Sequence, residues 1–264
     1  EDEKDATNIA KKILSYFQGE IKDWKADDQK KLSNIMPKDR RWSYPVRDII
    51  RIISDIEQFT EIRPDYGKGI VSCFIRIEGK PFGLLANDSQ HLGGAIDSEG
   101  ADKASSFIEM CSEYGLPIIS HVETTGFMVG PDSEKEGAVK RISNLFKLGS
   151  KVKVPLTAIF LRKGYGLGAQ AMVGGSLHEP VYTAAWPTGE FGAMGLEGAV
   201  KLGFKKELEK IEDNSKREKL FNSLVEKLYD KGKAIEAAAH LEIDAVINPS
   251  ETRSVILKSQ KAFV

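Results

Sequence analysis

One transition in the sequence constrains the fold more than any other: an apolar run passes directly into a stretch crowded with glycine. Residues 154–161 read VPLTAIFL, and residues 162–176 read RKGYGLGAQAMVGGS, with five glycines among fifteen residues. Glycine loses more backbone freedom on folding than any other residue, so such a cluster needs a structural or chemical reason. The pattern predicts a buried strand, a tight turn with a bare backbone, and a helix that starts immediately afterwards.

The sequence on both sides alternates between strand and helix patterns. Two apolar runs, 70–77 and 82–86, flank the segment EGKP and predict a β-hairpin. Further strands are expected at 116–122 and 181–186, and a short apolar run, 243–247, precedes the last helix. Helical spacing predicts helices over 46–60, 102–113, 134–148 and 205–240, and from about residue 251 onwards. This alternation indicates a single α/β domain with helical arms.

The two ends of the chain are more charged than this core. Residues 1–45 carry many charged side chains, and Ile9, Ile13 and Phe17 recur at helical spacing, which predicts an amphipathic helix. We therefore expect a charged N-terminal helical arm or linker over 1–45 and the α/β domain over 46–264.

The composition argues against several classes of protein. The formal net charge of −1 gives no electrostatic reason to expect nucleic acid or a membrane surface as a partner. No apolar run approaches the ~20 residues of a membrane-spanning helix, and the first residues, EDEKD, are unlike a signal peptide. Cys73 and Cys111 lack metal or redox spacing, so we expect free thiols and a cytoplasmic location. Because the chain does not begin with Met, we expect it to be a piece of a longer protein.

The glycine stretch fits a dinucleotide-binding motif only weakly. The segment from Gly166 to Ala171 matches G-x-G-x-x-A after a strand and before a helix. That fingerprint requires an acidic residue about 20 positions further on, at the end of the next strand. Here the next expected strand ends in Trp186-Pro187-Thr188, and Glu190 follows only after the proline. Dinucleotide binding is therefore the weaker interpretation.

An oxyanion hole is the stronger chemical interpretation of the same residues. A helix start presents N–H groups without acceptors, and a bare backbone lets a substrate oxygen approach them. The preceding strand also ends in a glycine turn, at Thr125-Gly126-Phe127. Two such turns could line one pocket of donors, in which a side chain at Gly168 would take the place of the oxygen. The alternative, that both are only tight strand-to-helix turns, stays open at this point.

The motifs in order carry a family resemblance. The segment GYGLGA at 164–169 resembles the G-Y-A-L-G-G turn of the crotonase superfamily. From about Tyr44 to the end, the chain resembles the C-terminal half of the carboxyltransferase (β) subunit of biotin-dependent acyl-CoA carboxylases of the propionyl-/acetyl-CoA type. The matching segments include RIEGKPFG at 76–83, GAID at 94–97, DKA at 102–104, GFMVG at 126–130, AWPT at 185–188 and DAVINPSETR at 244–253.

The resemblance implies a fold, a reaction and a site. The fold would be crotonase-like, with ββα units wound into a superhelix. The reaction would transfer a carboxyl group from carboxybiotin, held on a carrier protein, to an acyl-CoA. The catalytic backbone N–H groups, which hold the ureido oxygen of biotin, would belong to Leu167 and Gly168, with Ala169 alongside. The residues implied to bind the cofactor are Gly126, Phe127, Tyr165, Gly166 and Gln170.

The resemblance also implies partners and leaves alternatives. The partners would be a biotin carboxyl carrier protein or biotin carboxylase subunit, an N-terminal acyl-CoA-binding half, and further copies in a dimer-based oligomer, with no metal. Gln170 stands where propionyl-type enzymes carry an aspartate associated with acyl-chain choice, so the acyl substrate is left open. One alternative is a subunit of a biotin-dependent decarboxylase or transcarboxylase. Another is a non-catalytic half that scaffolds the enzyme.

The ionisable side chains argue for a site built from backbone donors rather than from an acid–base pair. The chain contains neither H-E-x-x-H nor G-x-S-x-G, and its four histidines are scattered. His121 lies within an apolar run, where a core histidine is expected. Asp97 and Glu123 are expected to be hydrogen-bonding turn residues. Met172, Met194 and Phe127 fit a biotin slot or core packing equally well.

Overall fold

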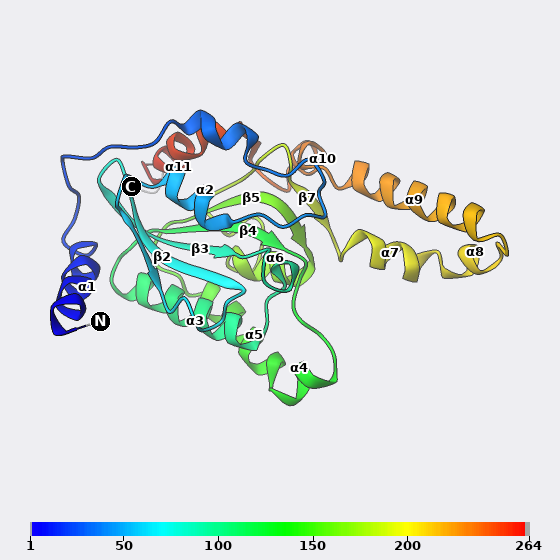
Figure 1. Ribbon diagram of the computed structural model, residues 1–264, viewed down its shortest axis with the longest axis horizontal. Coiled ribbons are helices and arrows are strands. Elements are labelled where there is room, and N and C mark those ends of the chain that lie inside the picture. The colour runs from blue at the N-terminus through cyan, green and yellow to red at the C-terminus, as the bar shows by residue number, and fades with distance from the viewer. Residues whose placement is uncertain (1, 262–264) are drawn as a thin grey trace.

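The computed structural model describes residues 2–261, which form one mixed β-sheet with helices on both faces (Figure 1). Within these residues the sheet has eight strands, in the order β1-β2-β3-β4-β5-β6-β8, with β7 paired to β5. The pairs β1–β2 and β2–β3 are antiparallel, and the remaining pairs are parallel. The strands are β1 (Phe59–Ile62), β2 (Ile70–Ile77), β3 (Lys80–Asn87), β4 (Ile118–Thr124), β5 (Leu156–Tyr165), β6 (Tyr182–Ala185), β7 (Glu190–Gly192) and β8 (Ala245–Val246).

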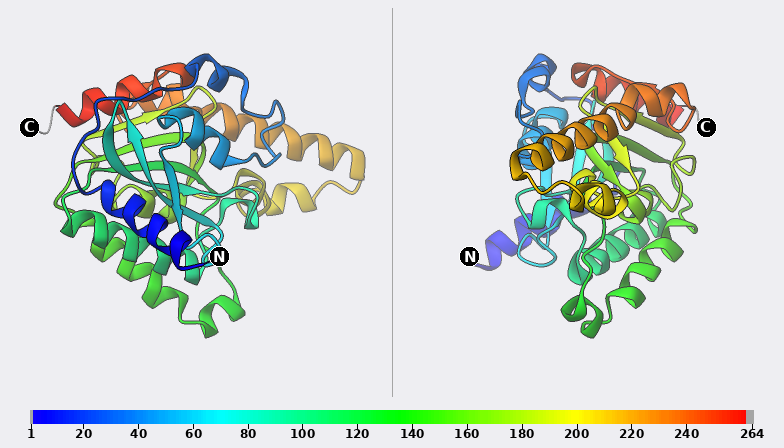
Figure 2. Two further views of the ribbon diagram at one scale, coloured as in Figure 1. Left: turned by 60° about the vertical axis from the view of Figure 1, so that its left-hand side comes forward. Right: turned by 90° about the vertical axis from the view of Figure 1, so that its right-hand side faces the viewer.

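Two apolar clusters lie on opposite faces of this sheet. One packs α3 and α5 against the sheet around Phe74 and Phe107, and the other packs α2 and α11 around Ile49 and Trp186 (Figures 1 and 2). The helices of the main body are α1 (Glu3–Ser15), α2 (Val46–Ile53), α3 (Ser98–Glu113), α4 (Pro131–Lys135), α5 (Ala138–Gly149), α6 (Gly166–Met172), α10 (Ala234–Ala239) and α11 (Thr252–Lys261). Short 3₁₀ helices are η1 (Gln29–Asn34), η2 (Leu92–Gly94) and η3 (Pro249–Glu251).

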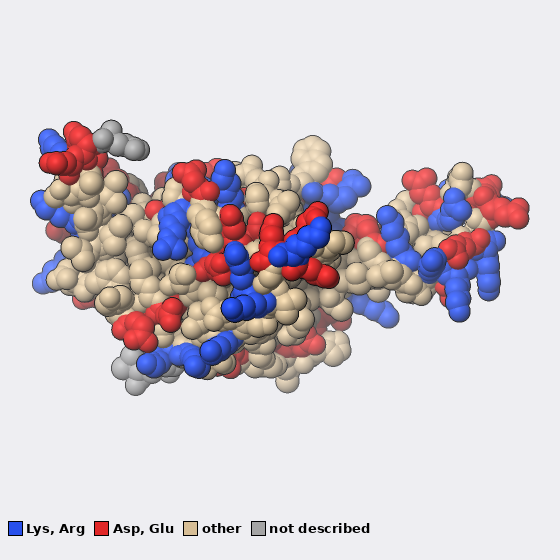
Figure 3. All heavy atoms as spheres, turned by 90° about the horizontal axis from the view of Figure 1, so that it is seen from below, with Lys and Arg blue, Asp and Glu red and all other residues tan. Residues whose placement is uncertain are grey.

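A two-layered arm of helices projects from one end of the body (Figure 1, right). It consists of α7 (Leu196–Gly203), α8 (Lys205–Glu209) and α9 (Asn214–Lys231), and α9 has no fully buried residue. Positive and negative side chains are interspersed over this arm, whereas charged side chains are scattered among uncharged ones on the body face seen from below (Figure 3). Among the described helices, none is both long and apolar enough to cross a membrane.

The β2–β3 hairpin forms as predicted, and its turn shows why glycine is needed there. Glu78 and Gly79 both have positive φ, at 51° and 76°. A Cβ atom on Gly79 would lie 1.9 Å from the carbonyl oxygen of Ile21, so only a bare backbone fits. The buried carboxylate of Asp55 accepts hydrogen bonds from both N–H groups of the turn, at 3.0 and 2.7 Å.

The structure corrects three predicted helices. The helix expected over 46–60 ends at Ile53, because Asp55 leaves it to cap the hairpin turn, and Phe59 begins β1. The helix expected over 134–148 is divided into α4 and α5 at Gly137, which has φ of 73°. The helical region expected over 205–240 is three helices, α8, α9 and α10, rather than one.

The N-terminal residues contribute to the core of the fold. Tyr16, Leu32 and Tyr44 are all buried. The guanidinium of Arg76, itself buried, donates to the carbonyl oxygens of Ser15 and Gly19 at 2.7 Å. The division between an arm over 1–45 and a domain over 46–264 stays a prediction.

Candidate functional site: two glycine turns and a buried polar cluster

The predicted glycine turn joins β5 to α6. Tyr165 is the N-cap residue of α6, and Gly166 begins the helix with φ of 58°. The first four N–H groups of a helix have no partner inside it. Among the residues that the structure describes, none accepts a hydrogen bond from the N–H groups of Leu167 or Gly168. The side chain of Leu167 is 61% exposed, so the turn lies at the surface.

The turn that follows β4 packs directly against this helix start. Gly126 has φ of 113°, and its N–H donates to Oγ1 of Thr124 at 3.1 Å. A Cβ atom on Gly168 would lie 2.8 Å from the Cα and carbonyl carbon of Gly126. A side chain at Gly168 would therefore collide with the other turn, and its effect on the place of the oxygen stays a prediction. The two turns form one backbone-to-backbone contact.

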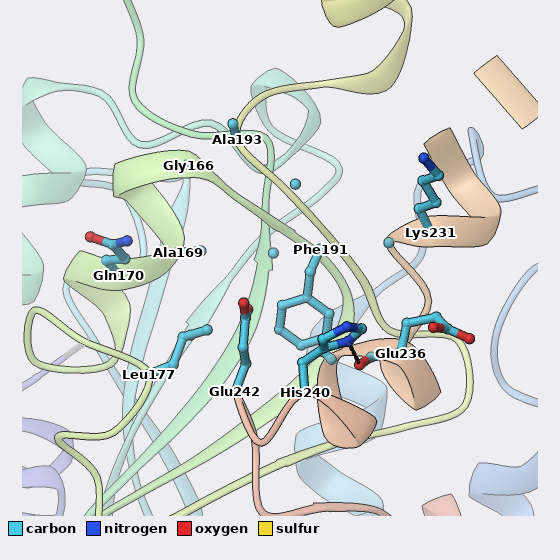
Figure 4. A pocket seen from close by; sticks show the side chains of 14 residues that line it. Gly166, Ala169, Gln170, Leu177, Phe191, Ala193, Lys231, Glu236, His240 and Glu242 are labelled. Carbon is cyan, nitrogen blue, oxygen red and sulfur yellow. Dashed lines mark hydrogen bonds between the residues drawn. The ribbon is translucent and has the colours of Figure 1, made fainter. Parts of the chain in front are cut away.

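Three of the predicted site residues line a cavity from which the other turn residues are absent. Gly166, Ala169 and Gln170 line a cavity of about 380 Å³ between α6, β7 and α10 (Figure 4). In that cavity Glu242 points inward, and Nδ1 of His240 lies 2.8 Å from the carbonyl oxygen of Glu236. The lining of this cavity does not include Leu167, Gly168, Gly126 or Phe127.

Phe127 and the two methionines have different surroundings. Phe127 packs against the core, with its ring centroid 6.2 Å from that of Phe146, and its segment pairs with Ile96. Met172 is buried in the core, whereas Met194 is 40% exposed. Of these three side chains, only that of Met194 is largely open to solvent.

A buried ion pair lies beside the turns and was missed by sequence reasoning. Nε and Nη2 of Arg162 donate to Oε1 of Glu123 at 3.0 and 2.8 Å, and the Tyr44 hydroxyl donates to Oε2 at 3.1 Å. All three side chains are buried. Glu123 is therefore a core carboxylate within β4, and the prediction of a turn residue was wrong. The signal in the sequence was a pair of opposite charges near the ends of two neighbouring apolar strands.

A β-bulge brings Arg162 and Lys163 toward Glu123. Val122 pairs with Phe160, but Thr124 pairs with Gly164, so β5 contains extra residues at this point. Bulges redirect side chains and occur near functional sites. The N–H of Lys163 donates to Oε2 of Glu123 at 3.1 Å. Burial lowers the pKa of the Lys163 ammonium, against the opposing influence of Glu123.

A second buried carboxylate, Glu190, starts β7 next to the same strand. Its side chain is 1% exposed, and Nη1 of Arg40 lies 3.6 Å from its Oε2. Burial is the main cause that raises the pKa of Glu190, and Arg40 opposes it. The Tyr165 hydroxyl is buried nearby, and burial raises its pKa as well.

Asp97 and His121 behave as expected. Asp97 is the N-cap of α3, and its Oδ1 accepts from the N–H of Gly100 at 2.7 Å. His121 is fully buried in β4, and this burial lowers the pKa of its imidazole to about 3. Within residues 2–261, no group of three or more His, Cys, Asp or Glu side chains is placed to hold a metal ion.

The sequence as a whole matches one protein family. The carboxyl transferase domain family matches residues 1–264, the full length of the chain. The chain belongs to this family. The resemblance identified from the motifs is thereby confirmed.

The relatives of this carboxyltransferase-family chain are about twice its length. It is 30% identical to the methylmalonyl-CoA carboxyltransferase 12S subunit of Propionibacterium freudenreichii subsp. shermanii, over 100% of this chain and 51% of the relative. It is also 30% identical to the propionyl-CoA carboxylase carboxyltransferase subunit of Haloferax mediterranei, over 97% of this chain and 51% of the relative. The chain thus spans about half the length of these relatives.

Solved structures show the same fold. A single-chain, multi-domain long-chain acyl-CoA carboxylase matches with a TM-score of 0.89 and 49% identity, over 96% of this chain and 25% of that protein. The transcarboxylase 12S hexamer matches with a TM-score of 0.85 and 28% identity, over 97% of this chain and 50% of that protein. The predicted fold class, α/β and crotonase-like, is confirmed by these likenesses.

Proposed function

We propose that this chain is the biotin-side half of a carboxyltransferase that moves a carboxyl group from carboxybiotin, on a carrier protein, to an acyl-CoA. The observation that carries the proposal is the family match over the full chain, which puts the paired glycine turns in a family of carboxyl-transferring enzymes. Relatives named as biotin-dependent acyl-CoA carboxylase subunits of Mycobacterium tuberculosis support biotin as the cofactor.

The turn residues fit the ureido group of biotin. Bound biotin would supply the carboxyl group and a ureido oxygen that can accept hydrogen bonds as charge develops on it. The N–H groups of Leu167 and Gly168 have no acceptor among the described residues, so they are free to donate to this oxygen. Such preorganised donors stabilise developing charge because they need no rearrangement during the reaction. Ala169, Tyr165, Gly166 and Gln170 would shape the turn, with Gly126 and Phe127 opposite.

The acyl substrate and the partners belong to the same proposal. We place an acyl-CoA-binding half, a biotin carrier or biotin carboxylase subunit, and further copies of the chain around it. The hexamer named for the transcarboxylase 12S protein supports an oligomer, and we propose that it is built on dimers. We propose an acetyl- or propionyl-CoA substrate and a cytoplasmic location. The long-chain carboxylase at 49% identity makes long acyl chains the competing substrate class.

The division of labour between the two halves gives the decisive experiment. We expect this chain alone to show no detectable decarboxylation of malonyl- or methylmalonyl-CoA with free biotin as acceptor. Adding the acyl-CoA half, fused or in trans, should restore turnover, since holding two reactants in register can lower a barrier by ~7–11 kcal/mol. Normal turnover by this chain alone would refute the proposal, because the glycine turn would then hold the thioester oxygen itself.

A substrate panel separates the remaining possibilities. Acetyl-, propionyl- and long-chain acyl-CoA are offered to the joined halves with a carboxylated carrier, and the initial rates are compared. Preference for a long chain would overturn the acetyl- or propionyl-CoA assignment. Net decarboxylation under all conditions would favour the activity named for the methylmalonyl-CoA decarboxylase α subunit of Veillonella parvula, which is 30% identical to this chain.

A further inference from the structure

Glu190 is a buried carboxylate whose hydrogen bonds are not completed. Both of its carboxylate oxygens are buried, and neither accepts a hydrogen bond of regular geometry from the described residues, although the Tyr165 hydroxyl lies near enough to lower the pKa of Glu190 as a hydrogen-bond donor. Burying a charged group without such partners costs free energy, so the position of this carboxylate calls for a structural or functional explanation. The 3.6 Å approach of Arg40 is an ion pair that is too long for a hydrogen bond.

The charged neighbours of Glu190 come from four separate parts of the chain. Arg40 approaches from the segment before α2, while Lys163 and Tyr165 approach from β5 and Glu123 from β4. Lys233, at the start of α10, forms a backbone bridge with Glu190, and its ammonium pairs with Asp230 at 2.7 Å. Arg40 is the cation that forms an ion pair with the Glu190 carboxylate, at 3.6 Å, while Lys163 lowers the pKa of Glu190 from a longer distance.

Arg40 also holds the segment that follows β7. Its Nη2 donates to Oε1 of Glu197, in the first turn of α7, at 2.7 Å, and its guanidinium lies 5.5 Å from the ring centroid of Tyr229. One arginine thus contacts both Glu190 and Glu197, which bracket the residues between β7 and α7. Because the Glu197 side chain is 46% exposed, its pair with Arg40 contributes little, whereas the pair with the buried Glu190 joins distant parts of the chain in the interior.

The segment held in this way supports the glycine turn. β7 pairs with the last three residues of β5, and Gly192 lies opposite Tyr165, the N-cap of α6. A Cβ atom on Gly166 would lie 2.8 Å from the carbonyl oxygen of Ala193. The turn and the residues after β7 are therefore in close contact, and movement of one displaces the other.

We propose that Glu190 is a positioning residue, whose carboxylate, held by Arg40, keeps β7 seated against β5 and so fixes the turn that presents the Leu167 and Gly168 N–H groups. This inference rests on the proposed function in taking those groups as the donors. Glu190 acts through Arg40 and the strand pairing.

The charge state of Glu190 separates positioning from folding. Because burial raises its pKa, the folded protein binds the Glu190 proton more tightly than the unfolded chain does. The stability that this group contributes is present at low pH and is lost as pH rises through its folded pKa. At neutral pH, Glu190→Gln should therefore leave stability unchanged or raise it. Positioning requires the charged carboxylate of Glu190 to pair with Arg40. Glu190→Gln should therefore make the turn that carries the Leu167 and Gly168 N–H groups more mobile.

The test uses the full-length protein with its acyl-CoA half, and compares Glu190→Gln with Glu197→Gln. Glu197 is the 46% exposed partner of the same arginine, so its substitution is the matched control. Hydrogen–deuterium exchange is followed in the peptide that covers residues 163–172. We expect exchange of the turn amides to be at least ~10-fold faster in Glu190→Gln and unchanged in Glu197→Gln, with no fall in the unfolding midpoint of either.

Kinetics and a second variant complete the test. A displacement of about 1 Å in a site can cost ~10²-fold in rate, so kcat of Glu190→Gln should fall by about that factor while KM for acyl-CoA stays within about twofold. We expect the wild-type rate to decline as pH falls and Glu190 is protonated, and we expect this decline to be absent in Glu190→Gln. Arg40→Gln should reproduce the faster exchange of the turn.

Two results would overturn the inference. One is wild-type exchange of the turn in Glu190→Gln, and the other is faster exchange throughout the chain, which would mean general destabilisation. If the wild-type protein shows no biotin-dependent transfer, the proposed function fails. The exchange measurement still decides the role of Glu190 in that case.

Discussion

The two glycine turns and the largely buried polar side chains beside them are held in opposite ways. These side chains, the polar cluster, are those of the pairs Glu123–Arg162 and Glu190–Arg40. The contact between Gly168 and Gly126 is made by backbone atoms within two short segments, each next to its own strand. The polar cluster is made by side chains, and it joins residues as distant in sequence as Arg40 and Glu190. A steric change should therefore break the first, whereas the second should respond to charge. We expect the site to depend on both, because β5 carries Arg162 of the polar cluster and leads directly into the glycine turn at Gly166.

The largest expected effect tests the polar cluster. Arg162→Met would leave the Glu123 carboxylate buried without its cation, and breaking a buried pair in this way costs ~3–5 kcal/mol of unfolding free energy. Denaturant unfolding of the full-length protein measures the change. The double variant Glu123→Gln/Arg162→Met removes both charges and should recover most of the loss. A single variant as stable as the wild type would show that the pair is not needed for stability.

The next effect tests the backbone region by sterics alone. Gly168→Ala adds one methyl group where 2.8 Å separates the Cβ position from Gly126. The turns must then move apart, and loss of a donor of this kind costs ~10²–10³ in kcat. Gly195→Ala is the matched control, because a Cβ atom there meets no atom within 4 Å. Equal rates in the two variants would mean that the contact between the turns does not matter for transfer.

A smaller effect concerns a buried polar group outside both regions. Burial lowers the pKa of His121 to about 3, so its imidazole is neutral in the folded protein. In the unfolded chain the pKa is about 6.5, so the imidazole takes up a proton on unfolding between these two pH values. As pH is lowered through this range, the free energy of unfolding should fall by up to about 1.4 kcal/mol per pH unit because of this group. His121→Leu should reduce that slope in denaturant titrations at several pH values. His178→Gln, at an exposed position, is the matched control.

The smallest effect comes from a local side chain that caps a helix. Asp97→Ala removes the hydrogen bond to the N–H of Gly100 and should cost ~1 kcal/mol of unfolding free energy, as N-cap losses typically do. Asp213→Ala removes the equivalent cap from α9, which has no fully buried residue, and should change global unfolding less. Equal losses in the two variants would mean that the projecting arm is as firmly coupled to the core as α3.

Much of the fold was predictable because its signals are local. The hairpin at Gly79, the buried strands β4 and β5 and the helix start at Gly166 follow from apolar runs and glycine positions. The failures have non-local causes. Phe59 belongs to a strand because it pairs with Ile75, and the helix before it ends because Asp55 caps a turn in another part of the chain.

The features of the site also divide into those that were predictable from local sequence and those that were not. The sequence by itself determined the glycine turns, since bare backbone at a strand end is a local property, and the family resemblance, since that depends on motifs in order. Only the tertiary structure decided that Gly168 faces Gly126, that Glu123 is a core carboxylate, and that Arg40 reaches Glu190. The physical reason is that an ion pair in the interior needs two side chains brought together by the packing of the whole sheet. The opposite charges near the ends of β4 and β5 are visible in the sequence, but their spacing along the chain does not show that the two side chains come into contact.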